Sequence, residues 1–298
     1  MMNFNEFVNE ATNKVAERLG KEMKTQTAHK NNREVTGITY KEYENNIVPI
    51  VYLDDVYDLY KENEDMEYII NNVVDIFNNA KTPDISVDNM FEDKSKIVLQ
   101  LINTEANKEE LDSLPHREFF DMSIIYRFVV SKSVEGLQTV KITNDVMKTI
   151  GITEEELFEF AKENTKVMLS SVIHNFGNII GPMLGLDSSD VDEANKMMII
   201  TNNENTWGAT NIIYDSVLEE VAEELGGDYY ILPSSIHEVI AVPAKEMEDR
   251  QDEFVSMVRE INLSSVAVSD RLSNQVFMYN AEGKYLVRVS DGEQLSVA

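Results

Sequence analysis

The sequence contains no cysteine, and that absence excludes several kinds of chemistry. Disulfide bonds, thiolate zinc sites, iron–sulfur clusters and cysteine nucleophiles all require a thiol group. A chain without thiols also suits a reducing compartment. We therefore expect a cytoplasmic protein.

Long apolar runs and a basic leader are missing as well. The first eight residues, MMNFNEFV, contain no Lys or Arg, which argues against a secretory signal peptide. The longest apolar stretches, such as residues 47–51, fall far short of the roughly 20 residues that a membrane span needs. We expect no association with membranes.

Basic residues are few, because 26 Lys and Arg stand against 54 Asp and Glu, for a net charge of −28 in 298 residues. Proteins that bind nucleic acid by neutralising phosphates need Lys and Arg in excess, so we expect no direct binding to nucleic acid. With 43% hydrophobic and 27% charged residues, the chain has the composition of a folded globular protein.

The hydrophobic patterns place strands in twos and threes with helices between them. This order is typical of an α+β fold with mainly antiparallel sheets. Residues 3–19 have apolar side chains at helical spacing, and Gly20 follows where a C-terminal cap belongs; the polar stretch from there to residue 33 is predicted to be a loop. The main predicted helices are 54–60, 66–77, 153–165, 214–225 and 243–261, and the main predicted strands are 35–40, 47–53, 97–102, 119–130, 138–142, 197–201, 229–232, 236–242, 275–279 and 285–289.

Residues 169–196 are predicted to connect two lobes, formed by residues 1–168 and 197–298. The stretch 167–186 is apolar but is interrupted by three glycines and a proline, which cost helix stability and permit bends. We expect this bendable apolar segment to present a surface to another protein, and the charged stretch 187–193 to form a solvated turn. The candidate binding residues of the segment are Phe176 and Ile180.

Two stretches resemble metal-binding motifs but lack essential residues. His237 and Glu238 begin like the zinc motif of metalloproteases, yet Ala241 occupies the position of the second histidine. Residues 187–192 begin like a calcium loop but lack its glycine and its final glutamate. Glycine-rich phosphate loops, dinucleotide fingerprints and nucleophile elbows are absent from the sequence. We expect neither a metal site nor a cofactor.

The connection between two predicted strands, residues 232–238, combines hydroxyl, imidazole and carboxylate side chains. One interpretation is a turn held by hydrogen bonds from serine to the backbone. The other is a catalytic cluster in which His237 acts as a base and Glu238 orients it. Strand alternation opposes that pairing, because adjacent strand residues face opposite sides. The candidate catalytic residues are Ser234, Ser235, His237 and Glu238.

The only tryptophan lies in an asparagine-rich stretch, residues 201–208. This stretch is either a polar loop with its indole lying over a sheet edge or a binding loop with an aromatic side chain that faces a ligand. The candidate binding residues are Asn202, Asn205 and Trp207.

Several motifs together resemble an uncharacterised bacterial family, domain of unknown function 5688. They are ITNDVM (142–147), GITEEELF (151–158), AKENT (161–165), MIITN (198–202) with GA (208–209), and YILPSSIHEV (230–239). The resemblance covers most of the chain from about residue 35 onward. It implies a bacterial, cytoplasmic protein and carries no activity, cofactor or catalytic residue with it.

Three functional hypotheses follow from these observations. The missing catalytic motifs, the dispersed acidic charge and the apolar segment 167–186 favour a non-enzymatic protein that binds a partner. An alternative is a hydrolase-like enzyme that works at the connection from Ser234 to His237. A further alternative is an acidic mimic of nucleic acid, motivated by the net charge of −28.

Overall fold

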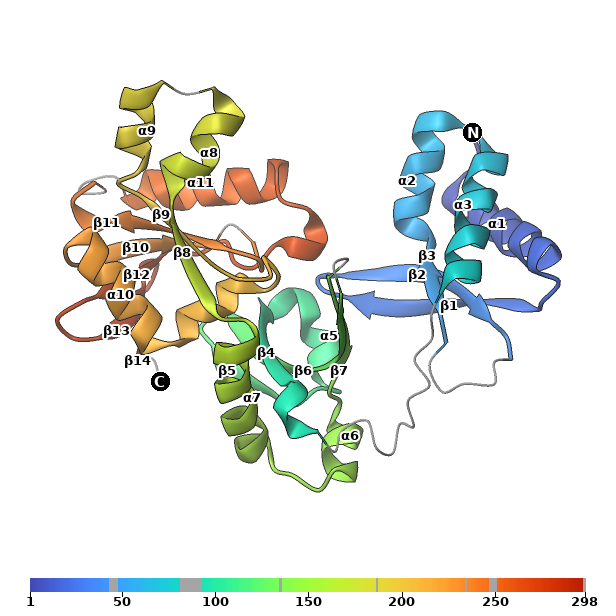
Figure 1. The fold of residues 1–298 in the computed structure, drawn as a ribbon, viewed down its shortest axis with the longest axis horizontal. Coiled ribbons are helices and arrows are strands. Elements are labelled where there is room, and N and C mark those ends of the chain that lie inside the picture. Colours follow the sequence, from blue (N-terminus) through green and yellow to red (C-terminus); the bar gives the residue numbers. More distant parts are fainter. Residues whose placement is uncertain are drawn as a thin grey trace. The chain divides into compact units, whose positions relative to one another are not determined.

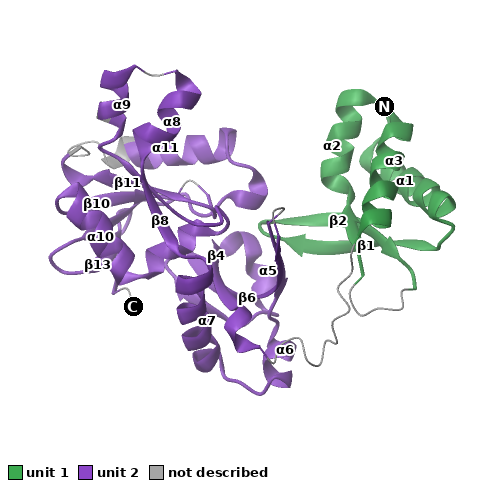
Figure 2. Cartoon of the chain, viewed as in Figure 1, with its two compact units in different colours: residues 1–92 green, residues 93–298 purple. Residues whose placement is uncertain are grey.

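The chain forms two compact units, residues 1–92 and 93–298 (Figure 2). The computed structural model describes residues 1–42, 48–80, 93–133, 136–185, 187–233, 235–246 and 251–296. The predicted connector 169–196 is therefore not the boundary between units. It lies inside the second unit, because strand β8 (Ser171–Asn175) pairs with β9 (Met198–Asn202) in one sheet.

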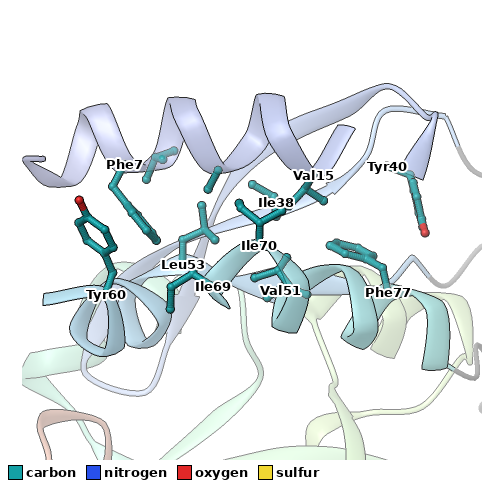
Figure 3. Packing of buried hydrophobic residues seen from close by; sticks show 13 residues of the cluster. Phe7, Val15, Ile38, Tyr40, Val51, Leu53, Tyr60, Ile69, Ile70 and Phe77 are labelled. Atoms are coloured by element: carbon teal, nitrogen blue, oxygen red, sulfur yellow. The ribbon is translucent and has the colours of Figure 1, made fainter. Parts of the chain in front are cut away.

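In its described residues, the first unit packs helices α1, α2 and α3 against a small antiparallel sheet (Figure 1). Its elements are α1 (Phe4–Leu19), β1 (Met23–Lys30), β2 (Arg33–Tyr40), β3 (Ile50–Tyr52), α2 (Leu53–Asn63) and α3 (Met66–Asn79), with strand order β1-β2-β3. Helix α1 ends as predicted at a left-handed Gly20. Its core, drawn in Figure 3, includes Phe7, Val15, Ile38, Leu53, Ile69, Ile70 and Phe77.

Strand β1 is an element that the hydrophobic pattern does not reveal. Its sequence, MKTQTAHK, has no apolar alternation, and the prediction of a loop there is wrong. The strand pairs with β2 along its whole length, from Met23 opposite Tyr40 to Lys30 opposite Arg33. Its side chains are mostly exposed, so backbone pairing forms this strand without a buried face.

The second unit contains a four-stranded antiparallel sheet built on the long strand β6 (Met122–Ser133). Strand β4 (Ile97–Asn103) pairs with one side of β6, and β5 (His116–Phe119) and β7 (Gly136–Lys141) pair with the other. Helix α7 (Glu154–Met168) packs against β4. A capping box begins this helix, where Thr153 and Glu156 exchange hydrogen bonds. Short helices in this part are η1 (Lys94–Lys96), η2 (Glu105–Asn107), α5 (Lys108–Leu111) and α6 (Asn144–Thr149).

A seven-stranded antiparallel sheet in the order β14-β13-β12-β10-β11-β9-β8 forms the rest of the unit. Its remaining strands are β10 (Tyr229–Leu232), β11 (Val239–Pro243), β12 (Phe277–Asn280), β13 (Tyr285–Arg288) and β14 (Gln294–Ser296). The helices are α8 (Phe176–Leu184), α9 (Ser188–Ala194), η3 (Gly208–Ile213), α10 (Asp215–Leu225), η4 (Ala244–Glu246), α11 (Gln251–Ser264) and η5 (Val268–Asp270). Both sheets are antiparallel and are combined with separate helices, which confirms the α+β prediction.

Different helices pack on the two faces of this sheet, α11 on one and α10 on the other. Tyr230 and Val242 pack with Val258 of α11 on one face. The neighbouring Tyr229 points to the other face, where its hydroxyl donates to the carbonyl oxygen of Leu218 in α10. Towards the β8 edge, the face that bears Val242 also carries Ile240 and the side chains of the pocket described below.

The apolar stretch 167–186 forms the edge strand β8 and helix α8. The predicted solvated turn after it is helix α9, whose first amides donate to the carboxylate of Asp187. Gly177 and Gly181 let α8 and α9 approach closely, because a Cβ on Gly177 would collide with the carbonyl of Val191. Among the described residues, no helix is long and apolar enough to cross a bilayer.

Candidate functional site

A pocket of about 500 Å³ lies on the seven-stranded sheet beside its β8 edge. Its floor is one face of three adjacent strands and carries His174 from β8, Ile199 and Thr201 from β9, and Ile240 from β11. These residues share a face because His174 pairs with Ile199, and Ile199 with Ile240. Strand alternation therefore builds the floor.

The wall of this pocket is the first half of α8, through Phe176, Ile179 and Ile180. Phe176 and Ile180 are two of the residues that the sequence selects for binding. The close packing of α8 on α9 at Gly177 and Gly181 faces away from these three positions. The helix can therefore pack on α9 and still present apolar side chains to the pocket.

A second pocket, of about 370 Å³, adjoins the first and has a polar lining. Asn205 and Glu238 line both pockets, which makes the two cavities one groove. The second pocket also contains Ser235 and His237 from the connection before β11, and Asp270 from η5. We call the first the α8 pocket, the second the Asp270 pocket, and the pair together the groove.

His237 is held on both ring nitrogens. Its Nδ1 accepts a hydrogen bond from the backbone N–H of Trp207, at an N···N distance of 3.4 Å. Its Nε2 lies 3.8 Å from Oδ1 of Asp270. Because Nδ1 accepts, the proton of the neutral imidazole belongs on Nε2, where it faces the Asp270 carboxylate.

Ser235 is not paired with this imidazole. Its hydroxyl donates to Oε1 of Glu238 at 2.7 Å and accepts from the backbone N–H of His237 at 3.0 Å. The segment is therefore a turn held by serine, in keeping with the first interpretation of residues 232–238. The remaining catalytic candidate, Ser234, lies outside the described residues.

The three candidate binding residues of the asparagine-rich loop, Asn202, Asn205 and Trp207, have different surroundings. Asn205 lines the groove. Asn202 is 2% exposed and holds the loop instead, because its Oδ1 accepts from the amides of Glu204 and Thr206. The indole of Trp207 lies outside both pocket linings, with the guanidinium of Arg127 4.8 Å from its ring centroid.

The loop and the turn are locked together below the groove. The Thr201 hydroxyl donates to the carbonyl oxygen of His237 at 2.9 Å. Gly208 fits between them, because a Cβ there would lie within 2.7 Å of the Cα of Thr201. A larger residue at position 208 would force the two segments apart.

The donor groups in the groove do not form a metal centre. No cluster of three His, Asp or Glu side chains with metal-binding geometry occurs within the described part of the chain. Among the residues that line the two pockets there is also no Lys or Arg. The groove therefore offers an apolar cavity, a polar cavity and two carboxylates, of Glu238 and Asp270.

The sequence matches DUF5688, a family of unknown function, over residues 4–281. The chain belongs to this family. The match confirms the resemblance found in the sequence motifs. No curated protein and no solved structure matches the chain, so the function of this DUF5688 protein has to be argued from its groove.

Two ionisable groove residues of the DUF5688 chain, His174 and Asp270, are not indicated by the sequence. Each is isolated in the sequence among residues with no shared motif. The pairing of β8 with β9 brings His174 beside Ile199, and the Ile236 amide, by donating to the Asp270 carbonyl at 2.8 Å, brings Asp270 beside the turn. Only the long-range topology places them in the site.

Proposed function

We propose that the second unit binds an extended segment of another protein in the groove. An apolar side chain of that segment enters the α8 pocket, and a Lys or Arg side chain enters the Asp270 pocket. The observation that carries the proposal is that an apolar and an acidic cavity adjoin through Asn205 and Glu238.

The size and lining of the α8 pocket support an aliphatic or aromatic anchor. Its volume of about 500 Å³ falls within the range of about 300–1,000 Å³ that is usual for ligand sites. Ile179 is 41% exposed although it is a large apolar side chain. Burial of one leucine-sized side chain contributes roughly 1.5–3 kcal/mol, which is sufficient for a specific anchor.

The charge of the second cavity supports a basic side chain. Asp270 and Glu238 contribute carboxylates, and no Lys or Arg lines the described groove. The whole chain carries a net charge of −28, which attracts cationic partners over several ångströms and repels acidic ones. The partner's cation is therefore the complementary group.

The free edge of β8 supports an extended conformation of the partner. Ser170 accepts from the Asn203 amide, and the Phe176 amide donates to Met197. By alternation, the backbone groups of Ser171, Ile173 and Asn175 point away from β9. An extended segment can hydrogen-bond to these groups by adding a strand to the sheet, as in known edge-strand complexes.

The hydrolase alternative receives less support from the groove. A nucleophilic serine requires an imidazole within hydrogen-bond reach, and the Ser235 hydroxyl bonds to Glu238 instead. The imidazole of His237 is occupied by the Trp207 amide. A screen for esterase and peptidase activity with the wild-type protein and His237→Ala tests this alternative directly.

The binding proposal is tested with synthetic peptides. The probes are capped eight-residue glycine–serine peptides that carry Leu and Arg at spacings of one, two or three residues. The comparison peptides carry Leu with Glu, or Ser with Arg. Trp207 is the only tryptophan, and its amide contacts His237 in the groove, so its emission reports binding.

We expect at least one Leu–Arg peptide to bind and both comparison peptides to bind at least about tenfold more weakly. Ile180→Asp should remove binding, whereas Met183→Asp should not, because Met183 is 77% exposed on the same helix and lines neither pocket. Asp270→Asn should weaken the Leu–Arg peptide and not the Leu–Glu peptide. Equal binding of all peptides, or loss of binding in Met183→Asp alone, contradicts the proposal.

A further inference from the structure

Arg127 lies on the four-stranded sheet, at a place that the groove does not include. Its side chain shares a face of β6 with Gln100 of β4 and Thr139 of β7. The Nε–H donates to the Thr139 hydroxyl at 2.8 Å, and Nη1 donates to Oε1 of Gln100 at 3.2 Å. Both partners are neutral, and Gln100 is only 2% exposed.

The positive charge of Arg127 has no carboxylate partner among the described residues. Lys141, which lies opposite Arg127 in the pairing of β6 with β7, does have a carboxylate partner. Its ammonium contacts both carboxylate oxygens of Glu110 at 2.5 and 2.6 Å. The Glu110 carboxylate is therefore hydrogen-bonded to Lys141, and it favours the charge of Arg127 only from a distance, without contacting the guanidinium. A cation that is taken out of water without a counter-ion is costly, and here burial lowers the pKa of Arg127 to about 10.

Most of the hydrogen-bonding capacity of Arg127 is unused. A guanidinium has five N–H donors in one plane, and the described contacts use two of them. The Nη2 group is not among the fully buried atoms that lack a partner, so it retains access to solvent. Three N–H donors therefore have no partner in the described contacts, and the two on Nη2 can be reached by a group that approaches from outside.

The indole of Trp207 orients this guanidinium. Its ring centroid lies 4.8 Å from the Cζ of Arg127, and Trp207 packs against the small apolar cluster that includes Val98 and Val129. The backbone of Trp207 has a φ of 57°, which is uncommon for a bulky residue and points to a position fixed by its surroundings. This cation–π contact leaves the hydrogen bonds of Arg127 to Thr139 and Gln100 in place.

We propose that Arg127 anchors a binding site for an oxyanion, a carboxylate or a phosphate group, on this face of the sheet. The Nη groups of Arg127 donate to two oxygens of the anion in the plane of the guanidinium. Thr139 and Gln100 fix the orientation of the side chain, and Trp207 covers it. Arg127 itself lines neither pocket of the groove.

Arg117 provides a matched control within the same sheet. It too lies over an aromatic ring, with its Cζ 3.9 Å from the centroid of Phe158. Its donors are already used, because Nε and Nη2 contact both carboxylate oxygens of Glu154 at 2.7 and 3.0 Å. Because these N–H donors of Arg117 already bind a carboxylate, Arg117 should not bind an added anion.

The test adds sodium acetate, inorganic phosphate or sodium chloride to the full chain at one fixed ionic strength. Fixed ionic strength is needed because screening of a charge of −28 stabilises the fold with any salt. Thermal unfolding and Trp207 emission are recorded together. At an anion concentration of ten times Kd, the ratio of folded to unfolded protein rises about elevenfold over chloride, and the emission of Trp207 changes in parallel.

The comparison of acetate with phosphate identifies which kind of anion the site binds. A response to acetate alone indicates a carboxylate, and a response to phosphate alone indicates a phosphoryl group. Arg127→Gln and Arg127→Lys should abolish the preference over chloride, because neither retains the planar fork, whereas Arg117→Lys should keep it. If acetate and phosphate act as chloride does on the wild-type protein, or if the preference survives in folded Arg127→Gln, the site does not exist.

Discussion

The backbone N–H of Trp207 donates to Nδ1 of His237, across 30 residues of sequence. This contact joins the asparagine-rich loop to the turn before β11, which are two of the three stretches that the sequence selects as functional. It also sets which imidazole nitrogen carries the proton and directs that nitrogen to Asp270. One hydrogen bond thus shapes the acidic end of the groove and places the indole over Arg127.

Replacement of His237 should be detected at Trp207. His237→Ala leaves the Trp207 amide without its acceptor, and we expect a shift in tryptophan emission and a loss of about 1 kcal/mol in the free energy of unfolding. His174→Ala is the control, because this exposed side chain has no contact with Trp207 among the described residues. Unchanged emission in His237→Ala would show that the contact does not order the loop.

A methyl group at position 208 should separate the loop from the turn. We expect Gly208→Ala to lower the free energy of unfolding by about 1–3 kcal/mol, because its Cβ would collide with the His237 carbonyl and the Cα of Thr201. The emission of Trp207 should change as well. Urea unfolding and emission spectra measure the two effects.

Gly151→Ala separates local crowding from a general loss of stability. Gly151 has a φ of +68° and open space where an alanine methyl group would lie, so the substitution costs backbone strain of roughly 1–2 kcal/mol. The emission of Trp207 should then stay as in the wild type. A Gly208→Ala protein with wild-type emission and stability would contradict the close packing at this point.

Asp121 should make the second unit less stable as the pH rises. Burial raises the pKa of this carboxyl, and its Oδ1 has no hydrogen-bond partner among the described atoms. The hydrogen bond that Oδ2 accepts from the Ser273 hydroxyl, at 2.7 Å, lowers the pKa but does not outweigh burial. A raised pKa means that the folded state binds the proton more tightly than the unfolded state does. The free energy of unfolding therefore falls as the pH increases from about 3.9, the unfolded value, through the folded pKa.

We expect Asp121→Asn to remove this fall and to stabilise the protein at pH 7 by about 1 kcal/mol, because the amide can still accept from Ser273. Asp187→Asn gives the opposite sign for comparison. Hydrogen bonds from Ser189 and the Asp190 amide lower the pKa of Asp187, and that contribution is lost as the pH falls. Urea unfolding between pH 4 and pH 7 measures the effect of Asp121, and unfolding below about pH 4, the unfolded pKa, measures that of Asp187. A destabilised Asp121→Asn protein at pH 7 would contradict the role of burial.

Local signals in the sequence predict much of the fold. The capping box at Thr153 and the glycine cap at Gly226 depend on neighbouring residues only, and both occur as the sequence indicates. The two strands of the β12–β13 hairpin are also predicted, and the left-handed residue of its turn is Lys284. The ring of Tyr285 occupies the space that a side chain on Gly283 would need, so this glycine allows a close approach.

Elements that depend on distant partners are less visible in the sequence. Strand β1 has a polar sequence and exists through its pairing with β2. Pro243 ends strand β11 opposite Tyr229, and the helix predicted from Pro243 is found as the short helix η4 (Ala244–Glu246) and as α11, which is described from Gln251. The candidate site shows the same division: Asn205 and His237 are found from local patterns, whereas Asp270 joins them only through the contact of its carbonyl with Ile236.

The central claim, that the groove binds an apolar and basic segment, is tested most directly by methyl NMR during titration with the best Leu–Arg peptide. The account predicts shifts for the methyl groups of Ile179, Ile180, Ile199 and Ile240, which line the α8 pocket. The buried Ile38, Ile69 and Ile70 in the core of the first unit should not shift. Shifts that spare the four pocket isoleucines, or that appear equally in the first unit, would contradict the claim.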